Sequence, residues 1–92
     1  MEIKTIQYIE CDEIFSLIDT HWAELSFAKG AENGSFHYFF CDDKAITTIR
    51  ESIANFEDKF PNYILQCRND LKLIYALREQ GITDGIYIHI FW

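Results

Sequence analysis

The sequence predicts an α+β domain with two layers, in which about three helices cover one face of a mixed or antiparallel sheet of four to five strands. Three observations lead to this class. Short β-branched and aromatic segments alternate with segments whose apolar residues recur at helical spacing. At 92 residues the chain has room for one domain, residues 1–92. Because 49% of the residues are hydrophobic and 16% aromatic, a core can form and disorder is not expected.

The first strand is expected at residues 2–9, which are rich in isoleucine. Asp12 then stands where it can cap a helix whose apolar residues recur from Ile14 to Trp22, with Trp22 in the core. The segment from Trp22 to Lys29 fits either a continuation of this helix or a strand. We favour a strand at this segment, because residues 30–34 form a good hairpin loop.

The clearest strand is the aromatic segment 35–41, which we expect in the centre of the sheet with both faces covered. A helix follows, capped at Asp42 and Asp43 and ended by Pro61. Its apolar stripe consists of Ile46, Ile49, Ile53, Phe56 and Phe60.

Residues 63–67 fit either a short strand or the first turn of the last helix. Asn69 or Asp70 is expected to cap that helix, and Gly81 to end it. Residues 86–92 form the final strand, which we place in the centre of the sheet or across a dimer because an exposed edge of this composition would aggregate.

The net charge of −7 belongs to the first half of the chain. Residues 1–43 hold nine acidic and two basic residues, whereas residues 44–92 hold six of each. An acidic half of this kind repels nucleic acid and attracts basic partners. We therefore expect no direct binding to DNA or RNA.

Neither a membrane nor secretion is indicated. No stretch approaches the ~20 uncharged apolar residues of a membrane span, and the N-terminus lacks the segments of a signal peptide. The cysteines, Cys11, Cys41 and Cys67, cannot all pair within the chain and show no CxxC spacing. We expect three reduced thiols in or near the core of a cytoplasmic protein.

Catalytic motifs such as GxSxG, HExxH, the P-loop and GxGxxG are absent from the sequence. A zinc site would have to draw on residues far apart in the sequence, His37, Cys41, Cys67 and His89, whose spacing does not predict convergence. A nucleophilic Cys41 is disfavoured because the carboxylates that follow it raise the pKa of its thiol. We expect no enzymatic activity and no cofactor.

Paired carboxylates at the ends of elements are the remaining signal. Asp12, Asp42 and Asp43 stand where helices are expected to begin, and capping accounts for acids there. Such residues still present charge to a partner. Together with Glu32 in the hairpin loop they form the predicted partner-binding set, Asp12, Glu13, Glu32, Asp42 and Asp43.

Two stretches resemble bacterial inhibitor families. Residues 15–40 (FSLIDTHWAELSFAKGAENGSFHYFF) resemble the opening of YezG-type immunity proteins, in which a helix and a Trp precede a strand, a glycine-containing loop and an aromatic strand. Residues 71–90 (LKLIYALREQGITDGIYIHI) resemble the last helix and strand of barstar-like ribonuclease inhibitors. The expected strand at 2–9 and the lack of an acidic binding helix depart from these patterns. Both resemblances imply a cognate inhibitor of a bacterial toxin domain.

Charge, aromatic content and the missing motifs lead to the same expectation. Aromatic anchors ringed by carboxylates suit the basic surface with which a nuclease grips phosphates. We therefore expect an immunity or antitoxin protein that neutralises a cognate basic toxin, in the first instance a nuclease, and binds no membrane. The alternatives are a phage-type inhibitor that mimics DNA, a generic interaction domain and a small metal-dependent or thiol enzyme.

Overall fold

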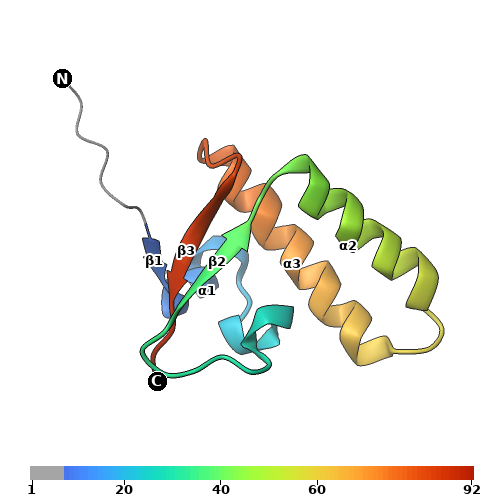
Figure 1. Cartoon of the computed structure of the whole chain (residues 1–92), viewed down its shortest axis with the longest axis horizontal. Helices are drawn as coiled ribbons and strands as arrows, with labels where there is room; N and C mark the ends of the chain where they lie inside the picture. The colour runs from blue at the N-terminus through green and yellow to red at the C-terminus, as the bar shows by residue number, and fades with distance from the viewer. Residues whose placement is uncertain (1–7) are drawn as a thin grey trace.

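The computed structural model describes residues 8–92 (Figure 1). In chain order its elements are β1 (Tyr8–Glu10), the 3₁₀ turn η1 (Cys11–Glu13), α1 (Ile14–Ile18), the 3₁₀ turns η2 (Trp22–Glu24) and η3 (Ser26–Ala28), β2 (Phe36–Phe40), α2 (Asp43–Phe56), α3 (Pro61–Glu79) and β3 (Gly85–His89). The fold is α+β, as the sequence predicts. The described residues form three strands, however, and not the four to five expected.

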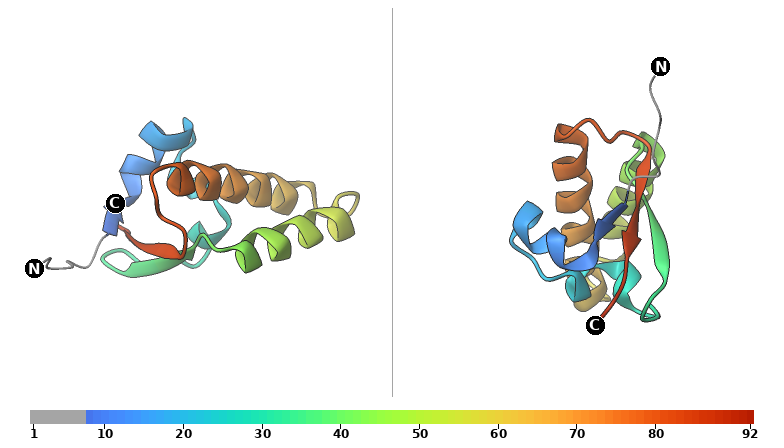
Figure 2. Two further views of the ribbon diagram at one scale, coloured as in Figure 1. Left: turned by 90° about the horizontal axis from the view of Figure 1, so that it is seen from above. Right: turned by 90° about the vertical axis from the view of Figure 1, so that its left-hand side faces the viewer.

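The sheet is mixed, with β3 in the centre. β3 pairs in parallel with β1 and antiparallel with β2, so that the strand order is β1-β3-β2. α1 and α3 lie behind one face of the sheet, whereas α2 packs on α3 and lies beside β2, in the layer of the sheet (Figure 2). Both the sheet and α2 therefore pack against α3.

The hydrophobic core lies between the sheet and α3. Alternate residues of a strand point to opposite faces, and the inward set of β3 is at most 4% exposed. The core combines this set with one stripe of α3: Ile86, Ile88, Ile90, Leu73, Ile74 and Leu77. Burial of each such side chain contributes about 1.5–3 kcal/mol, which anchors β3 as the central strand.

Four predicted features are confirmed. β2 lies within the aromatic segment 35–41. The Asp42 carboxylate accepts a hydrogen bond from the Ala45 N–H at 2.9 Å and so caps α2. β3 is the central strand, and Gly81, with a φ of 91°, follows the end of α3.

The first third of the chain departs from the predictions. β1 begins at Tyr8, and residues 2–7 of the expected strand lie outside the described residues. Asp12 does not cap a helix, because it lies inside η1. The helix expected to reach Trp22 ends at Ile18, since Asp19 adopts a left-handed conformation with φ of 54°.

The strand expected within residues 22–29 is also wrong, because this segment forms η2 and η3. Its backbone is bonded by side chains of α3 and not by a neighbouring strand. The Asn69 amide donates to the Glu24 carbonyl at 2.9 Å, and the Ser26 N–H donates to Asp70 at 3.0 Å. Asn69 and Asp70 therefore do not cap a helix but lie buried within α3.

The junction of α2 and α3 differs from its prediction as well. α2 ends at Phe56, and Pro61 is the first residue of α3, where its missing N–H costs nothing. Residues 63–67 are helical, the second of the two expectations. The junction of α2 and α3 lies far from the sheet (Figure 1). Phe56 ends α2 and Phe60 precedes α3, and the two are 38% and 53% exposed. No helix within residues 8–92 is long and apolar enough to cross a membrane.

Candidate functional site: an aromatic sheet face and its free edge

One face of the sheet carries a group of aromatic side chains. The residues that alternate with the inward-facing isoleucines point away from α3, and the register of the strands places them side by side. We call this surface the aromatic face; it consists of Tyr8, Phe36, Tyr38, Phe40, Tyr87 and His89. Within residues 8–92 no helix or strand covers it (Figures 1 and 2).

The rings of the aromatic face contact one another across the strands. Phe36 stacks on His89 with ring centroids 4.6 Å apart, and Tyr38 meets the edge of Tyr87 at 4.9 Å. Tyr8 meets Phe36 at 5.5 Å. Such pairs add about 0.5–1.5 kcal/mol beyond area burial and hold the rings in place before any partner binds.

The exposed area of this face is large for a chain of this size. Four of its rings, those of Tyr8, Phe36, Phe40 and Tyr87, are 41–58% exposed. With about 200 Å² for each ring, roughly 400 Å² of aromatic surface meets water, which is the size of the largest apolar patch on a typical monomer, and such patches are often functional.

The expected position of β2 is therefore wrong. The density of aromatics suggested a central strand covered on both faces, but in the sheet of residues 8–92 β2 is an edge strand, and its outer face is exposed. The reason is that α3 covers a single face of the sheet and that β3, with isoleucine at every inward position, occupies the centre.

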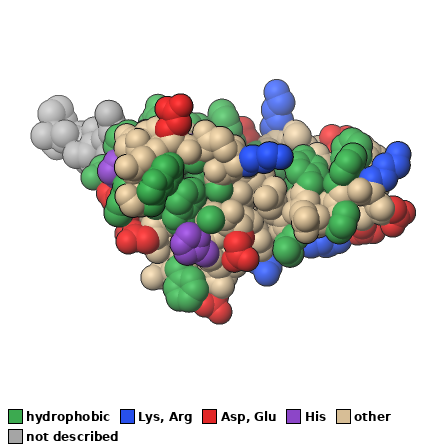
Figure 3. Space-filling model, turned by 90° about the horizontal axis from the view of Figure 1, so that it is seen from below, with side chains coloured by type: hydrophobic (Ala, Val, Ile, Leu, Met, Phe, Trp, Pro, Cys, Tyr) green, Lys and Arg blue, Asp and Glu red, His purple; other side chains and the backbone are tan. Residues whose placement is uncertain are grey.

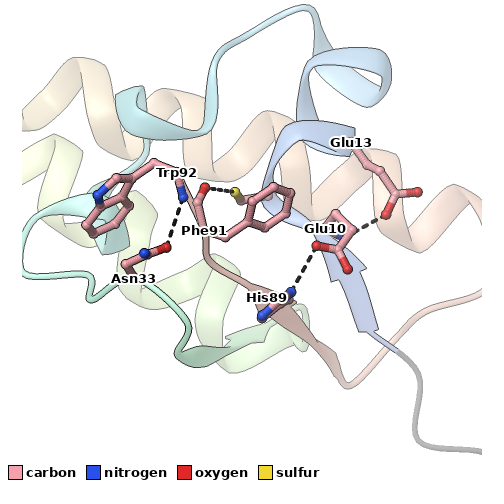
Figure 4. A network of polar contacts seen from close by, with 7 residues as sticks. Glu10, Glu13, Asn33, His89, Phe91 and Trp92 are labelled. Atoms are coloured by element: carbon pink, nitrogen blue, oxygen red, sulfur yellow. Dashed lines mark hydrogen bonds and ion pairs between the residues drawn. The ribbon is translucent and has the colours of Figure 1, made fainter.

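The end of the sheet at His89 is held by polar contacts (Figure 4). The His89 Nδ1 lies 2.9 Å from a carboxylate oxygen of Glu10, and the Glu10 N–H donates to Glu13 at 2.6 Å. The Trp92 N–H donates to Asn33 at 3.0 Å, which ties the end of the described chain to the loop before β2. These contacts bring β1, β3 and the loop 30–35 together beside the aromatic face.

The five acids predicted to bind a partner do not form one cluster. Asp12 and Glu13 follow β1, and Glu32 precedes β2, so these three lie at the end of the sheet near His89. Asp42 and Asp43 follow β2 and lie at the opposite end, near Asp84. The two groups of acids therefore lie at opposite ends of the aromatic face. The ends of β2 between them, Phe36 and Phe40, are four residue steps or about 13 Å apart.

Several of these acids already have partners. Glu13 accepts the Glu10 N–H, Asp42 caps α2, and Asp43 lies 3.1 Å from the guanidinium of Arg78. Figure 3 looks onto the end of the sheet, with the aromatic face edge-on: hydrophobic, histidine and acidic side chains lie together at this end, whereas Lys and Arg side chains lie with further acidic ones over the helix pair. The end of the sheet therefore carries acidic side chains beside apolar ones.

A pocket of about 600 Å³ lies beside β2. Its walls come from residues 37–40 of β2 and from the first half of α2, and Ser26, Phe27 and Asp70 also line it. Asp70 is 4% exposed, and both of its oxygens accept hydrogen bonds from Ser26, one from the N–H and one from the hydroxyl. The pocket is thus apolar with a carboxylate in its wall.

Burial sets the protonation of the groups in this pocket. It raises the pKa of Asp70 above the usual range, although the hydrogen bonds from Ser26 oppose the shift. It lowers the pKa of His37, whose ring stacks on Phe27 at 4.8 Å, so His37 is neutral at pH 7. His37 therefore adds no positive charge to the wall of the pocket, to which Asp42 and Asp70 also belong.

The thiols and histidines do not form a reactive or metal-binding cluster. Cys11, Cys41 and Cys67 are free and buried. Burial, more than the neighbouring Asp42, raises the pKa of the Cys41 thiol to about 11. His37 and His89 lie on opposite faces of the sheet, and residues 8–92 contain no group of three or more possible metal ligands.

The aromatic face was not predicted, although the sequence contains a signal for it. In residues 86–91 isoleucine alternates with Tyr87, His89 and Phe91, and β2 carries aromatics at every other position. A strand with this period has one apolar inner face and one aromatic outer face. The roles of Ser26 and Asp70 had no such signal, because the two residues are 44 positions apart.

Comparisons with known proteins add no family or relative. No family model matches the chain, and neither a curated protein nor a solved structure is similar to it. The site must therefore be interpreted from its own residues.

Proposed function

We propose that this chain is a binding protein without catalytic activity that docks its aromatic face on a basic surface of another protein. We propose further that it is an immunity or antitoxin protein whose partner is a toxin, with a nuclease as the first candidate. The observation that carries the proposal is the exposed aromatic face between two groups of acids.

The aromatic face has the composition of the centre of a protein interface. Aromatic anchors supply most of the binding energy at such centres, and polar residues around them exclude water. A standard interface takes about 800 Å² from each partner. The roughly 400 Å² of exposed ring surface would fill its centre, and acids such as Asp12, Glu32 and Asp43 would form its rim.

Charge favours a protein partner over nucleic acid. Aromatic sheet faces that stack on single-stranded nucleic acid combine their rings with a basic groove. The strands of residues 8–92 carry no Lys or Arg, and the charged residue among them is Glu10. A DNA mimic would present a row of carboxylates, whereas the acids here stand at the two ends of an aromatic surface.

Two features support an inhibitor of a toxin in particular. They are the net charge of −7 and the resemblances of residues 15–40 and 71–90 to immunity and ribonuclease-inhibitor families. A nuclease binds phosphates with a basic cleft, and an acidic rim is steered toward such a cleft at a rate that falls with salt.

Capture from a lysate of the native host tests the proposal. The full chain serves as bait at low and at high salt, beside a double variant, Phe36→Ser with Tyr87→Ser, that removes two exposed rings of the aromatic face. The matched control is Phe56→Ser with Phe60→Ser, which removes two rings of similar exposure at the far end of the helix pair. Retained proteins are identified by mass spectrometry, purified and assayed for nuclease activity with and without the chain.

We expect a basic protein to be retained at low salt by the wild-type chain and the control but not by the aromatic-face variant. The chain should also suppress the nuclease activity of that protein. Equal retention by all three baits would exclude the aromatic face, and a partner that stays active in the complex would exclude inhibition.

A further inference from the structure

No backbone group of residues 8–92 pairs with the outer edge of β2. The Ile90 N–H donates to the Ser35 carbonyl, and the Cys41 N–H donates to the Asp84 carbonyl. Bonded and non-bonded residue pairs alternate along an antiparallel ladder. The N–H and C=O groups of Phe36, Tyr38 and Phe40 therefore point away from β3, toward the free edge.

This edge lacks the usual protection against an added strand. Edge strands are normally blocked by Lys, Pro, bulges or inward-pointing charges, or are covered by a helix or loop. α2 lies beside β2 but does not close its edge, because a pocket lies between them. β2 contains Phe36, His37, Tyr38, Phe39 and Phe40, has none of these devices, and pairs with β3 without interruption. Its composition is that of a central strand, so its edge is complementary to another strand.

The pocket of about 600 Å³ lies along this same edge, between β2 and α2. A strand added to β2 would point alternate side chains toward α3, and the pocket is placed to receive one of them. Its apolar walls include Phe27 and Ile49, which suit the methylene groups of a long side chain. Asp70 in its wall and Asp42 at its rim outnumber the single base, Lys44.

We propose that an extended segment of the partner protein adds to the free edge of β2 as a fourth strand and places a Lys or Arg side chain in the pocket beside Asp70. This inference rests on the proposed function for the existence of a protein partner. It adds the binding mode, which is strand addition with a side-chain pocket for specificity. A second copy of this chain is disfavoured as the occupant, because each copy carries a charge of −7 and like charges repel.

The binding mode is testable without the natural partner. Random nine-residue peptides displayed on phage are selected on the immobilised full chain at physiological salt. We expect enrichment of peptides that alternate β-branched or aromatic residues with polar ones and carry a Lys or Arg at one fixed position. Absence of enrichment, or enrichment without a basic residue, would overturn the proposal.

The enriched peptide is then made in two N-methylated forms, one for each alternate set of its amides. Strand addition needs only the set that faces β2, so methylation of that set should abolish binding and methylation of the other should leave it. In the bound state the amide hydrogens of Phe36, Tyr38 and Phe40 should exchange about tenfold more slowly. Equal effects of the two methylated forms, or unchanged exchange, would exclude strand addition.

The pocket is tested with Asp70→Asn, and Asp58→Asn is the control, since it removes an exposed acid on the loop between α2 and α3. Asp70→Asn should weaken the enriched peptide about tenfold, the loss expected for one charge-assisted contact. Asp58→Asn should leave the affinity unchanged, and an equal effect of both would place the basic side chain elsewhere. Because no lysate is involved, the peptide result can stand or fail independently of the capture experiment.

Discussion

At the scale of single residues, the Asp70 carboxylate supplements the contact that Asn69 makes between α3 and the segment of η2 and η3. It lies in the middle of α3, and its two oxygens accept hydrogen bonds from the N–H and the hydroxyl of Ser26. An unpaired N–H buried at this position would cost about 1–3 kcal/mol, so an acceptor is required there. A charge is not required, because a neutral amide oxygen can accept the same bond.

Substitution at Asp70 separates the acceptor from the charge. We expect Asp70→Ala to lower the free energy of unfolding by about 1–3 kcal/mol, because the Ser26 N–H loses its acceptor. Asp70→Asn should have little effect or stabilise the chain at pH 7, because it keeps an acceptor and removes a buried charge. Urea unfolding of the three proteins measures both changes. A loss for Asp70→Asn as large as that for Asp70→Ala would show that the charge itself is needed.

The same variants give a pH dependence with a defined sign. Burial raises the pKa of Asp70 in the folded chain above its ordinary value of 3.8, so the folded state holds the proton more tightly than the unfolded state. The contribution of Asp70 to stability is therefore greatest below pH 3.8 and declines as pH rises through the folded-state pKa. We expect the stability of Asp70→Asn relative to wild type to increase over that range. A difference that is constant with pH would contradict the shift.

At the scale of secondary-structure elements, Gly85 sets how β2 lies on β3. Gly85 pairs with Phe40, and a Cβ added to it would lie 2.7 Å from the Phe39 carbonyl oxygen and 2.7 Å from the Tyr38 ring. The carbonyl belongs to the backbone of the ladder and cannot move aside without separating the strands. Glycine is therefore required at this position by space, and not by its dihedral angles.

We expect Gly85→Ala to destabilise the chain by about 1–3 kcal/mol, the usual cost of overpacking. The ring signals of Tyr38 and Tyr87 should shift in the NMR spectrum, because the Tyr38 ring is the other obstacle. Thr83→Ala, an exposed substitution two residues away, is the control and should change stability by less than about 0.5 kcal/mol. Wild-type stability in Gly85→Ala would mean that the two strands separate at little cost.

The elements that could be predicted are those whose signals are local. Asp42 predicts the start of α2, and isoleucine at alternate positions predicts β3. The segment from Trp22 to Ala28 could not be predicted, because Asn69 and Asp70, more than 40 positions away, bond its backbone. The same limit applies to the site. The acids of the predicted set were visible as loop residues, but their division between two ends of the sheet follows from strand order, which the sequence did not specify.

At the scale of the whole molecule, the sheet and the helix pair differ in burial and in charge. α3 contains seven buried residues, Ile64, Cys67, Asn69, Asp70, Leu73, Ile74 and Leu77, whereas α2 contains none. The second helix packs mainly on α3, and its distal end carries the exposed Phe56. The ion pair between Glu57 and Arg68 at this end is more than half exposed and adds little. α2 and the end of the helix pair far from the sheet should therefore be the least stable part of residues 8–92.

This gradient predicts the order in which the chain opens. An amide hydrogen exchanges through the opening reaction of lowest free energy that exposes it, and elements with few buried contacts open first. We expect the amides of α2 between Thr47 and Ile53 to exchange at least about tenfold faster than those of β3 and of the Leu73–Leu77 turn, a difference of about 1.4 kcal/mol. Native-state hydrogen exchange followed by NMR measures this directly. If the amides of α2 and β3 exchange with the same free energy of opening, the prediction is wrong. The sheet and the two helices then unfold together as one cooperative unit. If α2 opens first, the wall of the pocket opposite β2 is the mobile one, and a strand that binds between them should slow exchange in α2 as well as in β2.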